Sequence, residues 1–432
     1  MGDAATAPFA ITISNTFDAV VDATITQPGA ADRTVSVAPN DLEVVSLGVA
    51  SLEATGVTDQ AFRVTTTAPV TVHQFNPINT PDVFTNDASL LLPATSVGTD
   101  YIVTAWPAVG FSSGAFSRGY VVVVNVGDED VDVTITASAS LQAGGPLPAM
   151  RAGQTETVTL AEGQVLTIMG EAAAGADVTG TEIRSTAPVA VFAGQECANV
   201  PNDSPFCDHL EQQLLPTDTW ASEFVAAKFQ PRAPFNPEPD VYRIIGREPG
   251  TTLTMDPPNS LVHNRTIGRG EIIQFEETRD FTIQASQPIA LTQFMVGSSY
   301  PGPAFGCDRS GIFPITTGCR IPDSPICGGT AIGDPAFLVN VPTDQFLSDY
   351  IVLTPSQYVE DYLNIIAPSG VTVRLDGSPV TTSPQRLAGW DIYRVPVTDG
   401  VHRVEADVAF GLYAYGYDCD VSYAYPGGLS LE

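Results

Sequence analysis

The sequence predicts an all-β protein of four tandem β-sandwich-like repeats that pack rigidly on one another. A strand-like segment recurs four times along the chain, and a proline-led segment recurs in register after it. The stretches between these markers alternate apolar and polar residues, with turn signals about every 8 to 12 residues, the spacing of sandwiches and barrels. A β-propeller, or a closed ring of β modules, is the alternative architecture.

The first marker is a small tripeptide that leads into an apolar run. Its copies are "TTAPVTVHQF" around Ala68, "STAPVAVFAG" around Ala187, "ASQPIALTQF" around Gln287 and "EADVAFGLYAY" around Ala406. Proline lacks a backbone N–H, so it is tolerated at the first residues of a strand. We therefore expect a strand to start at each of these positions.

The second marker follows the first three copies and ends the chain after the fourth. It reads "LLPATSVGTDYIV", "LLPTDTWASEFV" and "NVPTDQFLSDYIV", which align on Pro93, Pro216 and Pro342. Position +4 and position +8 are apolar or aromatic in every copy, so we predict that both are buried: Val97, Trp220, Phe346, Tyr101, Phe224 and Tyr350. Position +7 is always acidic, which predicts an exposed or turn-capping carboxylate: Asp100, Glu223 and Asp349.

A chain of 432 residues is too long for one hydrophobic core. The markers place the repeats at 1–92, 93–215, 216–341 and 342–432, and the third carries a long loop stapled by disulfides. The loops after each recurring strand span 75–87, 197–207, 297–333 and 417–422. Long loops on a rigid scaffold are where binding surfaces usually lie, so the stapled loops 197–207 and 297–333 are the predicted binding face. The alternative is that the disulfides only restrain these long loops.

The charge balance excludes some partners. The chain carries 49 acidic and 18 basic residues, a formal net charge of −31, which argues against binding to nucleic acid or to an anionic membrane surface. No apolar stretch is long enough for a transmembrane helix. The start "MGDAATAP" is typical of a chain from which a signal peptide has been trimmed, so we expect a secreted or cell-surface protein.

Six cysteines and only four histidines favour disulfides over a zinc site, because no CxxC motif occurs. Disulfides indicate an oxidising compartment. The short loops "CANVPNDSPFC" and "CRIPDSPIC" favour the pairs Cys197–Cys207 and Cys319–Cys327, which leaves Cys307–Cys419 as a long-range pair. Six cysteines permit 15 connectivities, so these pairs stay hypotheses.

Catalytic motifs are absent from the sequence: no HExxH, GxSxG, GxGxxG or P-loop occurs. We therefore predict a protein that is not an enzyme and needs no cofactor, with calcium as the one possibility. The densest acidic run, "GDEDVD", offers the weak calcium candidates Asp128, Asp130 and Asp132. A solvated hairpin turn is the simpler interpretation of the same run.

Loop aromatics are the candidates for ligand contact, because aromatic rings stack on sugars and fill partner pockets. Trp106 and Tyr300 are the best placed in the sequence, although packing is the alternative for Trp106. The long loop adds four further candidates: Phe305, Asp308, Arg309 and Asp323. The closing stretch "GLYAYGYDCDVSYAYPGGL" places tyrosines at alternate positions, and its match to the recurring strand favours packing over a ligand platform.

Four segments resemble the family of the IgG-Fc-binding protein N-terminal region and its bacterial relatives. They are "CDHLEQQLLPTDTWASEFV", the Ala-Pro-Val strand, "GVHRVEADVAFGLYAYGY" and the ending "SYAYPGGL". The resemblance covers about residue 10 to 429. It implies an extracellular, non-enzymatic protein that is adhesive or associated with the matrix, and it offers no catalytic residue.

The leading hypothesis is thus a non-catalytic extracellular or cell-surface binding and adhesion protein, which presents disulfide-stapled loops to a protein or glycan partner. The first alternative is a structural subunit of an extracellular fibre or surface layer, for which self-assembly would be required. The second alternative is a carbohydrate-binding or carbohydrate-active module.

Overall fold

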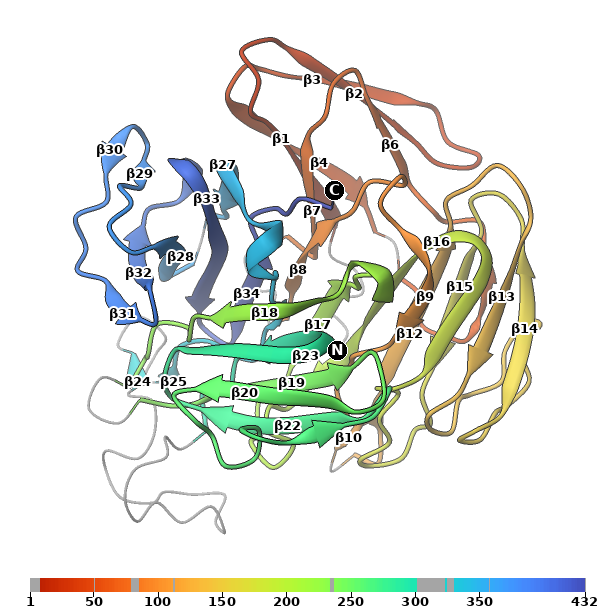
Figure 1. Cartoon of the computed structure of the whole chain (residues 1–432). Coiled ribbons are helices and arrows are strands. Elements are labelled where there is room, and N and C mark those ends of the chain that lie inside the picture. Colours follow the sequence, from red (N-terminus) through yellow and green to blue (C-terminus); the bar gives the residue numbers. More distant parts are fainter. Residues whose placement is uncertain are drawn as a thin grey trace. The chain divides into compact units, whose positions relative to one another are not determined.

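The computed structural model describes residues 8–49, 51–78, 85–111, 113–233, 237–300, 323–324, 330–356 and 358–431. Within these ranges the chain forms strands and two 3-10 turns, η2 (Thr217–Thr219) and η3 (Thr343–Gln345), and no α-helix, which confirms the all-β prediction (Figure 1). The chain divides into two compact units. The first comprises Met1–Ile78, Ala88–Ala198 and His209–Thr219, and the second comprises Asn79–Asp87, Asn199–Asp208 and Trp220–Glu432.

The N-terminal part of the first unit is a β-sandwich. Its four-stranded sheet has the order β4-β1-β7-β8, and its three-stranded sheet has the order β3-β2-β6. Ile11, Ala23 and Val45 come from both sheets and share one buried core, because alternate side chains of each strand face inward. The strands are β1 (Phe9–Asn15), β2 (Val21–Thr26), β3 (Arg33–Val37), β4 (Asp41–Gly48), β6 (Arg63–Thr66), β7 (Thr71–Asn76) and β8 (Asp87–Leu91).

The rest of the first unit is an eight-stranded sheet with the path β14-β13-β16-β12-β15-β5, to which β9 and β17 add by pairing with β16. Alternate residues of β12 and β13, such as Val121 and Val133, meet in one core. The strands are β5 (Gly56–Thr58), β9 (Gly98–Ile102), β12 (Gly119–Asn125), β13 (Val131–Thr136), β14 (Thr155–Leu160), β15 (Val165–Met169), β16 (Glu182–Ala198) and β17 (Asp208–Gln213), with a separate hairpin of β10 (Val109–Gly110) and β11 (Phe116–Ser117).

The second unit contains two further sheets of the same kind. In the first, β23 pairs with β20, β19, β18 and β26. Its strands are β18 (Ala221–Ala226), β19 (Asp240–Gly246), β20 (Thr251–Asp256), β21 (Thr266–Ile267), β22 (Ile272–Glu277), β23 (Phe281–Phe294) and β26 (Phe337–Val339), and a small hairpin pairs β24 (Asp323–Ser324) with β25 (Thr330–Ala331).

In the last sheet β33 takes the same central place and pairs with β27, β28, β29 and β34. Its strands are β27 (Leu347–Thr354), β28 (Glu360–Pro368), β29 (Arg374–Leu375), β30 (Ser378–Pro379), β31 (Gln385–Leu387), β32 (Trp390–Val397), β33 (Gly400–Asp418) and β34 (Val421–Pro426). The three sheets built on β16, β23 and β33 share this connectivity. We keep the boundaries 1–92, 93–215, 216–341 and 342–432 as a proposal.

One long strand organises each of these three sheets. The first half of β16 pairs with β13 and β9, and its second half pairs with β12, with a register shift between Arg184 and Val189. Pro188 lies at this change of partner, where a missing N–H is tolerated. The predictions that strands start at Ala187, Gln287 and Ala406 are therefore wrong, because these residues lie inside β16, β23 and β33. In the N-terminal repeat the same position does separate two strands, β6 and β7.

The recurring positions +4 and +8 are buried, as predicted. Their exposed fractions are at most 8% in all three copies: Val97, Trp220, Phe346, Tyr101, Phe224 and Tyr350. Tyr101 also uses its hydroxyl, which accepts from the N–H of Gly98 at 2.8 Å and donates to the carbonyl of Val189 at 2.7 Å. This hydroxyl ties the start of β9 to the bend of β16.

The acidic position +7 holds the long strand from the side. Asp100 contacts Arg184 of β16 at 3.2 Å, and Asp349 contacts Arg403 of β33 at 2.7 Å. These side chains are about one third exposed or more, so each pair contributes little to stability, roughly 0–1 kcal/mol.

The C-terminal tyrosines are packed in the core, so the packing interpretation is confirmed. All five are at most 2% exposed: Tyr413, Tyr415, Tyr417, Tyr423 and Tyr425. Their hydroxyls find polar partners, as buried tyrosines usually do. Tyr413 accepts from the N–H of Val341 at 2.9 Å, and Tyr417 donates to the carbonyl of Gln230 at 2.7 Å.

Tyr101→Phe should lower the thermal unfolding temperature, because the N–H of Gly98 and the carbonyl of Val189 lose a buried partner, at a cost of about 1–3 kcal/mol. Tyr393→Phe is the matched control, since its hydroxyl has no hydrogen-bond partner among the described residues. Differential scanning calorimetry of both variants checks this. Equal melting of the two variants would contradict it.

Candidate functional site

The inter-strand loops of all four repeats contribute to one site in the second unit, which we call the loop junction. It consists of 85–87, 199–208, 295–300, 331–336 and 418–422. They connect β7 to β8 (85–87), β16 to β17 (199–208), β23 to β26 (295–300 and 331–336) and β33 to β34 (418–422). They overlap the loops predicted as the binding face. Three buried aspartates, Asp87, Asp208 and Asp334, lie at its centre.

Asp208 joins two loops that are far apart in sequence. Its Oδ1 accepts from the N–H of Asn86 at 2.8 Å, and its Oδ2 accepts from the N–H of Ser422 at 3.2 Å. The side chain is 0% exposed. A buried carboxylate that accepts backbone N–H groups fixes the path of both loops, because leaving those groups unpaired would be costly.

The other two aspartates extend the same arrangement. Asp87 Oδ2 accepts from the N–H of Phe337, at the start of β26, at 3.2 Å. Asp334 Oδ1 accepts from the N–H of Ser298 at 3.3 Å and from its hydroxyl at 3.0 Å. The loop before β26 is therefore held at both of its described ends by carboxylates.

Burial shifts the pKa of these acids upward. Desolvation is the largest cause for Asp208, whose pKa is raised well above its ordinary value, and the neighbouring charges of Asp334 and Asp87 raise it further. Desolvation also raises the pKa of Asp334 to about 6, although its hydrogen bonds from Ser298 act in the opposite direction. The charge of Asp334 in the junction therefore changes at mildly acidic pH.

A sequence signal for these aspartates exists but was missed. Aligned on the prolines of the second marker, an aspartate stands before every copy: Asp87 before Pro93, Asp208 before Pro216, Asp334 before Pro342 and Asp420 before Pro426. The separation is six residues in two repeats and eight in the other two. Because the register is not constant, the alignment that found positions +4, +7 and +8 did not reveal it.

Backbone contacts complete the junction. The N–H of Gly297 donates to the carbonyl of Val200 at 2.9 Å, and the hydroxyl of Ser299 donates to the carbonyl of Pro205 at 2.7 Å. The N–H of Gly333 donates to the carbonyl of Asp418 at 2.8 Å. Each loop therefore supports its neighbour.

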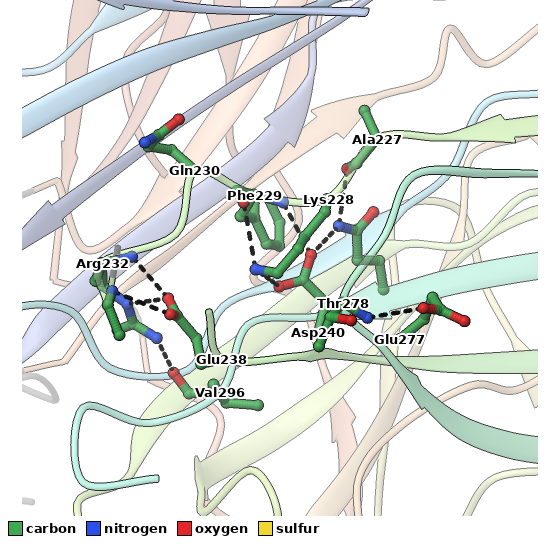
Figure 2. A network of polar contacts seen from close by, with 12 residues as sticks. Ala227, Lys228, Phe229, Gln230, Arg232, Glu238, Asp240, Glu277, Thr278 and Val296 are labelled. Atoms are coloured by element: carbon green, nitrogen blue, oxygen red, sulfur yellow. Dashed lines mark hydrogen bonds and ion pairs between the residues drawn. The ribbon is translucent and has the colours of Figure 1, made fainter. Parts of the chain in front are cut away.

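Arg232 clamps the junction from a buried network that Figure 2 shows. Its guanidinium donates to the carbonyls of Ile332, Gly333 and Val296 at 3.0, 2.6 and 2.7 Å. Glu238 pairs with it at 3.1 Å. Although burial acts in the opposite direction, the charges of Arg232 and Lys228 and backbone hydrogen bonds hold the pKa of Glu238 at about 2.

The predicted ligand-contacting aromatics are not at the surface. Trp106 is 1% exposed and Tyr300 is 2% exposed, and the hydroxyl of Tyr300 donates to Glu276 at 3.0 Å. Their placement gives no support to the stacking role and fits packing. Asp323 begins β24, and nothing is described of its side chain. Phe305, Asp308 and Arg309 lie outside the described residues.

Cys197, Cys207 and Cys419 are each disulfide-bonded. Cys307, Cys319 and Cys327 lie outside the described residues, so the three predicted pairings remain predictions. Disulfide-bonded cysteines fit an oxidising compartment.

The calcium candidates lie on and beside an exposed turn. Asp128 contacts Arg63 at 3.6 Å with its side chain 83% exposed, and Asp132 accepts from the hydroxyl of Thr159 at 2.6 Å on the outer face of β13. Asp130 is exposed between them. No group of three or more acidic, histidine or cysteine side chains in the described part of the chain is arranged to hold a metal ion.

A second polar cluster lies in the first unit, where β17 contacts β7. His209 Nε2 lies 3.3 Å from the amide nitrogen of Asn76 and 3.2 Å from the hydroxyl of Tyr120. Glu211 accepts from Asn76 at 3.0 Å and from Gln74. These contacts fasten β17, the strand of the "CDHLEQQLLP" segment.

A family model and a human protein that both carry the name IgGFc-binding protein match most of the chain. The family model described as IgGFc binding protein matches residues 87–416. The human protein named IgGFc-binding protein (Homo sapiens) is 23% identical over 347 residues, which cover 79% of this chain and 6% of the human protein. The chain thus corresponds to a small part of that relative. No solved structure matches it. None of the described helices is both long and apolar enough to cross a membrane.

The pKa of Asp334 predicts a pH dependence. Between about pH 4 and pH 6 the folded state binds more protons than the unfolded state, so this group's stabilisation is lost as the pH rises, by on the order of 3 kcal/mol. Asp334→Asn keeps the acceptor for Ser298 without the buried charge. We expect the variant to be more stable than the wild type near pH 7 and to match it near pH 4.

Denaturant unfolding across this pH range measures the difference. Asp361, whose pKa burial raises to about 7, titrates in both proteins and cancels in the comparison. Asp407→Asn, at an exposed position, is the control and should leave the profile unchanged. A constant difference between Asp334→Asn and wild type at every pH would refute the assignment.

Proposed function

The chain belongs to the IgGFc binding protein family, and on this premise we propose that it is a non-catalytic, extracellular or cell-surface binding and adhesion protein. Its binding face is formed by the loops of the loop junction. The observation that carries the proposal is the convergence of all four inter-strand loops on buried carboxylates. Such an arrangement presents loops in a fixed conformation, which lowers the entropy lost on binding a partner.

Phe206 is the anchor that we propose on this face. It is 58% exposed, although it is a large aromatic residue, and it lies in the loop between two disulfide-bonded cysteines. Its backbone φ is +72°, a conformation that non-glycine residues rarely adopt and that marks functional loops. Aromatic side chains held on rigid backbone are frequent hot spots of protein interfaces.

The partner that we propose is a protein. The human relative is named for binding the Fc part of IgG, and the Fc fragment is therefore the first probe. The net charge of −31 predicts that the partner surface is neutral or basic and that association slows as salt concentration rises.

Phe206→Ala should weaken binding to the Fc fragment by about tenfold or more, roughly 1.4 kcal/mol, and should leave the melting temperature unchanged. Phe17→Ala is the matched control, because Phe17 is also a strongly exposed phenylalanine (45%) and lies in the first unit. Biolayer interferometry with native and enzymatically deglycosylated Fc separates protein from glycan recognition. Equal binding by both variants would remove Phe206 from the binding face.

The long loop of the third repeat should contribute to the same face. Replacing residues 301–329 with a short Gly/Ser linker keeps Gly297, Ser298 and Ser299. Because it removes Cys307, the predicted partner of Cys419, the same variant carries Cys419→Ser. We expect a folded protein by circular dichroism that has lost Fc binding. Undiminished affinity would show that this loop is outside the binding face, and no binding by the wild type would refute Fc as the partner.

A further inference from the structure

The chain contains a single lysine, Lys228, and it is buried against an aspartate. Lys228 is 3% exposed and Asp240 is 2% exposed, and Nζ lies 3.2 Å from Asp240 Oδ1 (Figure 2). Lysine is almost never fully buried, and a buried ion pair of this kind is rarely stabilising overall. The burial of the only lysine in the chain therefore requires an explanation.

The pair is buried between aromatic rings and polar side chains that include Asp280, Arg394 and Gln293. Lys228 follows β18, and Asp240 is the first residue of β19. Phe229 and Tyr415 contact each other with ring centroids 4.8 Å apart beside the pair. A lysine in such an environment becomes a nucleophile once it is neutral, because water does not compete for its lone pair.

The two oxygens of Asp240 have different environments. Oδ1 faces the lysine, whereas Oδ2 accepts from the N–H of Phe229 at 2.9 Å and from the side-chain amide of Gln293 at 2.7 Å. Two fixed donors on one oxygen are the arrangement that stabilises an oxyanion during acyl transfer. Oδ2 is therefore the oxygen that would carry negative charge, and Oδ1 is the one that can leave.

The protonation of Asp240 fits the same chemistry. Burial raises the pKa of its carboxyl above the ordinary value, although Lys228 and the hydrogen-bond donors act in the opposite direction. A neutral carboxyl group beside a neutral amine is the reactive form of an acid–amine pair. Transfer of one proton from Nζ to Oδ1 within the ion pair produces both at once.

We propose that Lys228 and Asp240 condense to form an intramolecular isopeptide bond between Nζ and Cγ. After the proton transfer, the Nζ lone pair attacks Cγ, and the carbonyl electrons move onto Oδ2, where Phe229 and Gln293 stabilise them. The Cγ–Oδ2 double bond then re-forms and the Cγ–Oδ1 bond breaks. Oδ1 leaves as water with the first proton and a second proton from Nζ, and one hydrogen stays on the amide.

The product fits the hydrogen bonds that are already present. Nζ contacts the carbonyl of Phe229 at 3.3 Å, so the amide N–H has an acceptor, and Oδ2 keeps its two donors. The reaction also replaces a buried ion pair with a neutral amide, which removes the desolvation cost of two charges. It closes the segment 228–240, which carries the Arg232 clamp of the loop junction.

The neighbouring pair of Arg232 and Glu238 provides an internal comparison. It is as deeply buried, and its closest contact is 3.1 Å. A guanidinium stays protonated and has no free lone pair to attack a carboxyl, so this pair cannot condense. The difference between the two pairs is therefore chemical and not a matter of burial.

The intact mass of the reduced, denatured full-length chain tests the proposal. We expect it to be lower than the sequence mass by one water. Trypsin should release a branched species in which 185–232, uncut at Lys228, is joined to 233–243. Amine labelling of the denatured chain should modify the N-terminus alone, because no other lysine exists. The full sequence mass with a reactive Lys228 would overturn the proposal.

Variants locate the bond. Lys228→Arg and Asp240→Ala should have their full sequence masses, whereas Asp240→Asn should condense with loss of ammonia in place of water. Glu238→Gln is the control and should still lose one water. A water loss that persists in Lys228→Arg would assign the dehydration to another site and would refute the isopeptide bond.

Discussion

The carboxylate of Asp208 is the interaction on which the rest of the site depends. It is buried, and it accepts backbone N–H groups from the first and fourth repeats. Asp87 and Asp334 do the same for the third. Carboxylates suit this task because each oxygen accepts more than one hydrogen bond, so a few side chains can satisfy the backbone of several irregular loops. The sheets could pack without them, but the loops would lose their fixed paths.

The sequence predicted the structure best where the same kind of residue recurs at a constant distance from the marker proline. It predicted the all-β class and the buried positions such as Trp220 and Tyr350, and its family resemblance is confirmed by the match over residues 87–416. The aspartates were not predicted, because the separation of aspartate and proline is six residues in two repeats and eight in the other two. The burial of Trp106 and Tyr300 could not be predicted, because a loop position in sequence does not reveal burial. The pair of Lys228 and Asp240 depends on Gln293, which lies far along the chain.

The long strands explain how one scaffold can serve as a support for loops. Because β16, β23 and β33 each pair with different strands along their first and second halves, the end of each long strand is fixed by its own partners. Loops that leave such strands start from a fixed direction, and Phe206, the proposed anchor, lies on one of these loops. The Arg232 clamp adds a third support, from the segment between β18 and β19.

The loop junction has a consequence for folding order. Its hydrogen bonds join residues 122, 214 and 250 positions apart. The loop at 85–87 therefore gains its partners only after Asp208 and Phe337 have been synthesised, and Asp208 gains the N–H of Ser422 later still. Contacts of such long range slow folding, and the unfinished N-terminal repeat would expose its buried carboxylate partners to water while it waits. The sheets would thus form before the loops reach their final paths.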